Sequence, residues 1–96
     1  TRKIAALVEC HQIPFALHDC TGPVNLMVNA HLSVHLVNVG LFEFARAFYH
    51  GWYREIVTVL PAVEDGNCLL PPGPGLGTQL SPAFLNRPDL IRRTTR

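Results

Sequence analysis

The chain has 96 residues, of which 48% are apolar and only 16% are charged, and its formal net charge at pH 7 is +1. A body this small exposes much of its surface to water, so the low charged fraction favours a piece of a larger protein over a free-standing domain. The near-neutral charge excludes the basic field that binding to nucleic acid requires, and no nucleic-acid partner is expected.

The N-terminal region predicts a short helix followed by a strand. Ile4, Leu7, Val8 and His11 recur at the spacing of one helix face, which predicts a helix from about Arg2 to His11 that has ended before Pro14. The next apolar run, Ile13–Leu17, is too short for a helix and suits a strand covered on both faces. No signal-peptide pattern precedes these elements, so a cytoplasmic location is expected.

The following segment repeats the order of helix and strand. Thr21 or Gly22 is expected to cap a helix that has Pro23 in its first turn and ends at about Leu36. Polar residues interrupt this helix too often for a bilayer span, so no membrane partner is expected. A second strand is predicted over Val39–Phe44. Helix, strand, helix, strand is typical of a parallel α/β sheet or barrel.

The remaining half of the chain has a different character. An aromatic block is interpreted as packing against another domain, because it lacks the basic surroundings of a base-stacking surface; it comprises Phe48, Tyr49, Trp52 and Tyr53. The β-branched run Ile56–Leu60 predicts a strand, and Asp65-Gly66 predicts a turn into a return strand over Cys68–Leu70. Ser81-Pro82 is expected to open a short helix that ends at about Asn86.

The Pro/Gly-rich segment Pro71–Gly77 superficially resembles a phosphate-binding loop. Such a loop is followed by Lys-Ser or Lys-Thr and by the start of a helix, and neither follows here. The segment is therefore predicted to be a rigid path along the surface.

Each of the two predicted barrel-type strands has a polar side chain near its carboxyl end, His18 in the first and Glu43 in the second. In parallel α/β barrels this edge is the catalytic one. A histidine can take up and return a proton near neutral pH, and a carboxylate nearby can act as an acid, a hydrogen-bond partner or a ligand. Position alone leaves open a structural histidine and a Glu43–Arg46 ion pair.

Two histidine patterns could indicate a metal. His31 and His35 lie at i and i+4 of one predicted helix, but no glutamate lies between them and no third ligand is evident, so helix packing is favoured. His18-Asp19 matches the dipeptide of metal-dependent HD phosphohydrolases, whose all-helical fold and further ligands the pattern does not supply.

The sequence has 3 cysteines, an odd number with no C-x-x-C pair: Cys10, Cys20 and Cys68. Neither a disulfide framework nor a zinc knuckle is indicated. We expect buried free thiols.

Several sequence blocks follow one another in a characteristic order: His18-Asp19-Cys20-Thr21-Gly22-Pro23, Glu43-Phe44, Ala47-Phe48-Tyr49-His50-Gly51-Trp52-Tyr53, Glu64-Asp65-Gly66, and Pro72-Gly73-Pro74-Gly75-Leu76-Gly77. In order and spacing they resemble the final part of mandelate racemase/muconate lactonizing enzymes of the enolase superfamily, especially the acid-sugar dehydratase branch. The resemblance spans nearly the whole chain.

The resemblance implies an α/β fold, namely the C-terminal part of a modified (β/α)₇β TIM-like barrel with the C-terminal segment of a capping domain. Residues 1–44 would be the last helix, strand, helix and strand of the barrel, and residues 45–96 would return to the capping domain. The rest of the barrel and of the capping domain would belong to a longer parent protein, which we expect to be a homo-oligomer.

The resemblance also implies an activity, the Mg²⁺-dependent removal of a proton α to a carboxylate. A sugar-acid dehydratase that forms a 2-keto-3-deoxy acid is expected, so the substrate would be a small carboxylate, an acid sugar. His18 matches the histidine of the seventh strand that acts as general acid or base, and Glu43 matches the carboxylate of the eighth strand that hydrogen-bonds the substrate. The Mg²⁺ ligands would lie on earlier strands, outside this chain.

Some positions depart from the family pattern. Leu17 stands where close relatives are expected to have proline, and Leu41-Phe42 is more apolar than usual. Asp19 is not expected to replace the absent aspartate partner of the histidine, because neighbouring strand residues point to opposite faces. A racemase or cycloisomerase of the same superfamily remains an alternative, as does an inactive fragment that only associates with other polypeptide. The isolated chain is expected to be inactive.

Overall fold

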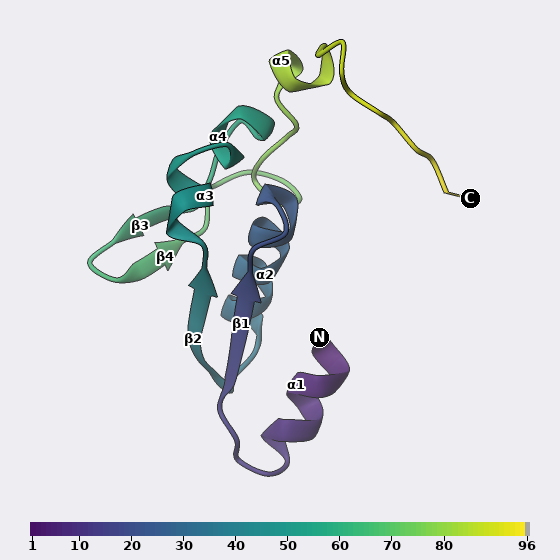
Figure 1. Ribbon diagram of the computed structural model, residues 1–96. Helices are drawn as coiled ribbons and strands as arrows, with labels where there is room; N and C mark the ends of the chain where they lie inside the picture. Colours follow the sequence, from purple (N-terminus) through teal and green to yellow (C-terminus); the bar gives the residue numbers. More distant parts are fainter. Residues whose placement is uncertain (96) are drawn as a thin grey trace.

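The centre of the chain is a parallel pair of strands, β1 (Phe15–Asp19) and β2 (Val39–Phe44), joined by the helix α2 (Pro23–His35). This computed structural model describes residues 1–95. α2 lies against the strand pair, and α1 (Arg2–Glu9) precedes β1 at the end where the strands begin (Figure 1). The predicted order of helix, strand, helix and strand is confirmed.

The first strand lies two residues further along the chain than predicted. It begins at Phe15, whose N–H donates to the carbonyl of Asn38 over 2.7 Å, because Pro14 has no N–H to give to the ladder. It continues through His18 and Asp19, which pair with Glu43 and Phe44. The strand therefore includes the two residues at which it was expected to stop.

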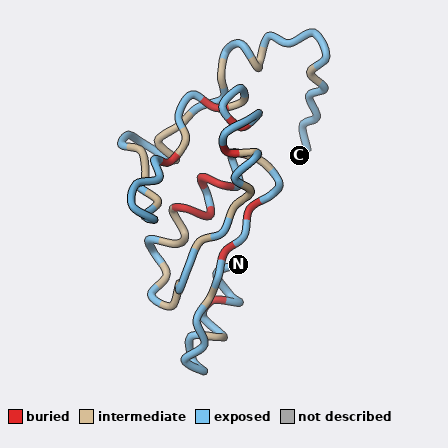
Figure 2. Tube along the Cα trace, turned by 60° about the vertical axis from the view of Figure 1, so that its left-hand side comes forward, coloured by how far each residue is buried: buried red, intermediate tan, exposed pale blue. Residues whose placement is uncertain are grey.

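The two faces of the strand pair differ in burial. In β1, Leu17 and Asp19 are buried whereas Ala16 and His18 are exposed, as expected when successive side chains alternate. The buried face packs on α2 and on the segment after β2, where Leu26, Tyr49 and Tyr53 form the core. Most of the buried residues lie in α2, at the end of β1 and in the short helices after β2, and a few isolated ones lie elsewhere (Figure 2). The opposite face is open.

The aromatic block folds into two short helices, α3 (Arg46–His50) and α4 (Tyr53–Ile56). Tyr49 is 8% exposed and Tyr53 is fully buried, both in a core that they share with Leu26 of α2. Trp52 is 39% exposed and contacts Phe48, with ring centroids 5.6 Å apart. Burial of the tyrosines fixes the helices against the carboxyl end of the strand pair.

The predicted strand Ile56–Leu60 is absent. Ile56 belongs to α4, and Val57 forms only an isolated antiparallel bridge with Leu80. The backbone N–H groups of Thr58 and Val59 bond to the segment at Thr78 and Gln79 instead of to a sheet. The backbone of this run is therefore satisfied by isolated hydrogen bonds to residues 78–81 and not by a sheet.

The predicted turn and return strand are present as a hairpin of β3 (Ala62–Glu64) and β4 (Asn67–Leu69). Asp65 and Gly66 both have positive φ, at 48° and 77°, which is the geometry a two-residue hairpin turn requires. The chain then follows an irregular path through Pro71–Gly77 to α5 (Pro82–Leu85), the predicted final helix. None of the helices in residues 1–95 combines the length and apolar character of a membrane span.

The cysteines are free, but the prediction that they are buried is wrong. Cys10 and Cys20 are exposed, because Cys10 lies at the end of α1 and Cys20 lies where the chain leaves β1 for α2. Cys68 is half-buried in β4, and burial raises the pKa of its thiol.

The chain is less compact than a free-standing domain of its size. Its radius of gyration is 15.0 Å, whereas a compact chain of this length is expected near ~12.5 Å. Large apolar side chains are exposed on α1 and on the open face of β2, including Ile4 at 57%, Leu7 at 63% and Leu41 at 58%. Such a surface is typical of a face that other polypeptide covers.

Phe48→Ala is expected to destabilise the parent protein by about 2 to 3 kcal/mol, because Phe48 packs against the core cluster and contacts both Trp52 and Tyr53. Trp52→Ala should cost less, since Trp52 is more exposed. Thermal unfolding of both variants measures the difference. Equal melting temperatures in wild type and Phe48→Ala would show that the ring does not contribute to the core.

Gly77→Ala is expected to lower the free energy of unfolding of the protein by at least roughly 1 to 3 kcal/mol. Gly77 has a φ of +70°, and a Cβ there would lie 2.6 Å from the carbonyl oxygen of Pro71. Gly75→Ala is the matched control, because Gly75 has a φ of +63° but no atom within 4 Å of the same Cβ. Chemical denaturation of the two variants separates the contact from the backbone strain, and equal losses would refute the close approach.

Candidate functional site

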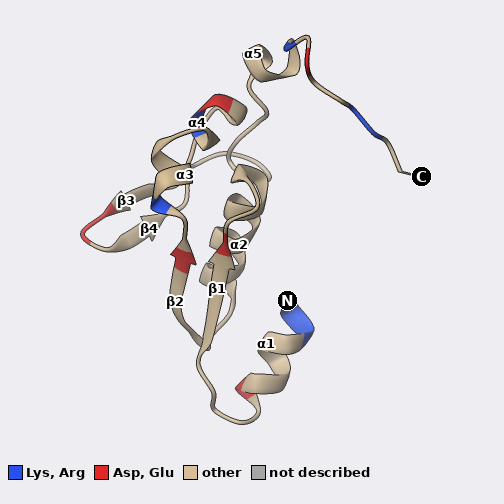
Figure 3. Cartoon of the chain, viewed as in Figure 1, with Lys and Arg blue, Asp and Glu red and all other residues tan. Residues whose placement is uncertain are grey.

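The structure brings His18 and Glu43 together at the carboxyl ends of β1 and β2. The two residues are register partners in the parallel pair, and His18 Nδ1 lies 3.4 Å from Glu43 Oε2. Their side chains are 54% and 65% exposed on the open face. Figure 3 shows acidic residues at the ends of both strands, namely Asp19 on β1 and Glu43 on β2.

The backbone that carries this pair is held firmly. The side-chain amide of Asn29, on α2, donates to the carbonyl oxygen of His18 over 3.2 Å. One residue further, the N–H of Ala45 donates to the carbonyl oxygen of Asp19 over 3.1 Å, which joins the end of β1 to the residue after β2. The strand ends are therefore fixed, while the His18 and Glu43 side chains project from the open face.

The exposure of the His18 and Glu43 side chains limits what their contact contributes to stability. An ion pair this exposed contributes little to the free energy of folding. Within residues 1–95 Glu43 contacts His18 and forms no ion pair with Arg46, the structural alternative that the sequence left open. The contact uses Nδ1, which leaves Nε2 of the imidazole for proton exchange with a bound molecule.

Sequence reasoning missed a second group at this strand end, the carboxylate of Asp19. Its side chain is fully buried on the face opposite His18, so the expectation that it points away from the pair is consistent with the structure. Asn25 Nδ2 donates to its Oδ1 over 2.6 Å, and the Tyr53 hydroxyl donates to its Oδ2 over 2.8 Å. Burial raises the pKa of the Tyr53 hydroxyl above its ordinary value, and the hydrogen bond to Asp19 raises it further.

The residues described here do not fit a magnesium site. Residues 1–95 contain no group of three or more His, Cys, Asp or Glu side chains that could hold a metal ion. His31, one of the two helical histidines, instead places its Nε2 3.2 Å from the carbonyl oxygen of Leu76 and so ties α2 to the Pro/Gly segment. A Mg²⁺ ion would need ligands from outside this chain.

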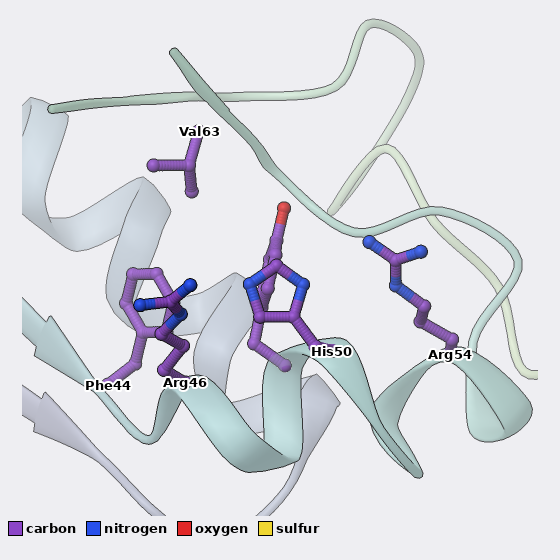
Figure 4. A pocket seen from close by; sticks show the side chains of 6 residues that line it. Phe44, Arg46, His50, Arg54 and Val63 are labelled. Carbon is purple, nitrogen blue, oxygen red and sulfur yellow. The ribbon is translucent and has the colours of Figure 1, made fainter. Parts of the chain in front are cut away.

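A separate hollow of about 470 Å³ lies beside α3 and α4. Three of the side chains that line it can carry positive charge, namely Arg46, His50 and Arg54 (Figure 4). The other lining residues are Phe44, Tyr49 and Val63. Neither His18 nor Glu43 belongs to it. The candidate site is therefore the His18–Glu43 pair at the strand ends, where the chemistry-bearing groups converge.

Two parallel strands joined by a helix, with titratable side chains at their carboxyl edge, are typical of part of an α/β-barrel enzyme. The chain belongs to the family described as enolase C-terminal domain-like, which matches residues 1–84. The fold class expected from the sequence is thereby confirmed, as is the resemblance to the mandelate racemase type.

Similar proteins agree with this assignment. The chain is 31% identical over 80 residues to D-xylonate dehydratase of Haloferax volcanii, covering 83% of this chain and 19% of that protein. It is 31% identical over 83 residues to a D-galactonate dehydratase family member of Enterococcus gallinarum, covering 83% of this chain and 20% of the relative. The chain thus spans about a fifth of the length of these relatives.

Solved structures give the same result. An enolase of the mandelate racemase subgroup from Agrobacterium tumefaciens superimposes with a TM-score of 0.77 at 44% identity, over 88% of this chain and 22% of that one. An enolase protein from environmental sequencing of the Sargasso Sea gives a TM-score of 0.80 at 43% identity, over 92% of this chain and 23% of that one.

Proposed function

We propose that this chain is the C-terminal portion of a sugar-acid dehydratase that converts an acid sugar into a 2-keto-3-deoxy acid. The observation that carries the proposal is the His18–Glu43 pair, held at 3.4 Å on the open face at the carboxyl ends of two parallel strands. The relatives named as D-xylonate and D-galactonate dehydratases support the choice of reaction and of substrate class.

In this reaction a base takes the proton α to the substrate carboxylate, the hydroxyl on the β carbon leaves, and the resulting enol becomes the 2-keto-3-deoxy acid. The base that takes the α proton would come from the part of the parent protein outside this chain. The departing hydroxyl needs a proton to leave as water. His18 donates that proton, because an imidazole can carry and release one near neutral pH. Nε2 is the donating atom, since Nδ1 faces Glu43.

Glu43 binds the substrate carboxylate, or the enediolate that replaces it. A hydrogen bond between Glu43 and this group requires either a proton on the Glu43 carboxyl group or a strongly electropositive site. Glu43 therefore orients the substrate and His18 reacts with it.

The parent protein supplies what this chain lacks. Mg²⁺, bound by residues outside the chain, would stabilise the negative charge that develops on the substrate. Residues 1–44 would complete the barrel, and residues 45–96 would form the C-terminal segment of the capping domain. A homo-oligomer is the proposed assembly.

The direct test uses the full-length parent protein with Mg²⁺ and a panel of acid sugars, with the 2-keto product as the readout. Formation of a 2-keto-3-deoxy acid supports the dehydratase. Inversion at the α carbon without loss of water would favour the alternative racemase, since a solved enolase of the mandelate racemase subgroup is 44% identical to this chain. An internal addition or elimination product would favour a cycloisomerase.

An inactive product that only associates with other polypeptide is the alternative of a different class. The exposed apolar side chains of α1 and β2 favour it for the isolated chain, because they require a cover. Intact-mass measurement of the source polypeptide separates the two cases. A product limited to these residues and without turnover would leave His18 and Glu43 without a catalytic role.

His18→Asn in the parent protein is expected to abolish turnover, with kcat falling by at least about a hundredfold, because proton transfer is lost while little volume changes. The melting temperature should be preserved, since the side chain is half exposed. His35→Asn is the control, because His35 is exposed at the end of α2. Retained turnover in His18→Asn would exclude the assigned role.

Glu43→Gln is expected to lower kcat more than it weakens Mg²⁺ binding, because the ligands lie elsewhere. Steady-state kinetics at saturating Mg²⁺ gives the first quantity and calorimetric titration with Mg²⁺ gives the second. Loss of metal binding in this variant would contradict the role as substrate partner and would indicate a ligand instead.

A further inference from the structure

Asp19 gathers hydrogen bonds from three different parts of the chain. Its Oδ2 accepts from the Tyr53 hydroxyl on α4, over 2.8 Å. Its Oδ1 accepts from Asn25 on α2 over 2.6 Å, and from the Thr21 hydroxyl and backbone N–H over 3.4 Å each. A fully buried carboxylate is costly unless it is satisfied in this way.

This network lies directly behind His18. Asp19 is the next residue in β1, and because strand side chains alternate, its carboxylate is anchored on the helix side while the imidazole projects from the open face. The carbonyl oxygens of both residues are also bonded, His18 to Asn29 and Asp19 to Ala45. The peptide that carries the imidazole therefore has no freedom to shift unless the network breaks.

We propose that Asp19 is a positioning residue, which, through its hydrogen bonds to Tyr53 and Asn25, holds His18 in the geometry required for proton transfer. This inference rests on the role proposed for His18. It assigns a role to α4, which follows the barrel strands in the chain: its Tyr53 hydroxyl donates to the second carboxylate oxygen of Asp19.

The Tyr53 hydroxyl is the donor that satisfies Oδ2 of Asp19. Its removal leaves one oxygen of a buried carboxylate without its partner, so the strand end must move or admit water to satisfy it. Displacements of about 1 Å in catalytic groups cost about a hundredfold in rate. The ring itself packs against Phe48 and Trp52, and Tyr53→Phe preserves those contacts.

The chain offers a matched control in Tyr49. Its hydroxyl is also buried and donates a short hydrogen bond, of 2.6 Å, but to the carbonyl oxygen of Pro61 and not to β1. Tyr49→Phe therefore removes the same group from the same core without touching the network. Any effect shared by both variants reports general destabilisation, and any effect confined to Tyr53→Phe reports positioning.

The first readout is the NMR signal of the His18 ring in the full-length parent protein, assigned by its disappearance in His18→Asn. Tyr53→Phe is expected to shift or split this signal, and Tyr49→Phe to leave it unchanged. An unchanged signal in Tyr53→Phe would overturn the proposal. Should Tyr53→Phe fail to fold, Asn25→Ala removes the other short bond and is read in the same way.

The second readout is kinetic. Tyr53→Phe is expected to lower kcat by roughly ten- to a hundredfold with little change in KM, and Tyr49→Phe to alter neither. A kcat equal to that of Tyr49→Phe would count against positioning. If His18→Asn leaves turnover intact, the proposed function fails, whereas the ring signal still decides whether Asp19 and Tyr53 place the histidine.

Discussion

The buried carboxylate of Asp19 is the constraint on which the rest of the structure depends. It lies at the end of β1 with no exposed surface, and it is satisfied by donors from Thr21, from α2 and from α4. Its backbone carbonyl extends the connection to Ala45, the residue that follows β2. Strands, crossover helix and C-terminal segment thus meet at one residue, and the candidate acid–base group is its immediate neighbour.

The sequence was sufficient to predict the strand and helix order of residues 1–44, because apolar runs of the two lengths alternate there without interruption. It also placed His18 and Glu43 at one edge, since parallel strands present their carboxyl ends together. The hairpin turn followed from Asp65-Gly66, whose positive φ angles few other residue pairs adopt. These features depend on local pattern, which a sequence displays directly.

The remaining features depend on contacts distant in sequence. Ile56–Leu60 has strand propensity but no partner strand beside it, and the end of α4 takes its first residue. Asp19 and Tyr53 are separated by the whole of α2, β2 and α3, so their hydrogen bond has no local signature. The sequence shows Thr21 and Asn25 shortly after Asp19 as possible donors, but it indicates neither the burial of Asp19 nor the tyrosine.

Because neighbouring side chains at the end of β1 lie on opposite faces, different contacts constrain residues 18 and 19 during evolution. Residue 18 meets whatever occupies the open face, whereas residue 19 meets only the interior of this chain. A lineage can therefore replace the reactive group at position 18 while the scaffold behind it stays intact, and changes at position 19 or 53 carry a cost for every chemistry alike. Adjacent positions in one strand would then diverge at very different rates among descendants that acquired new substrates.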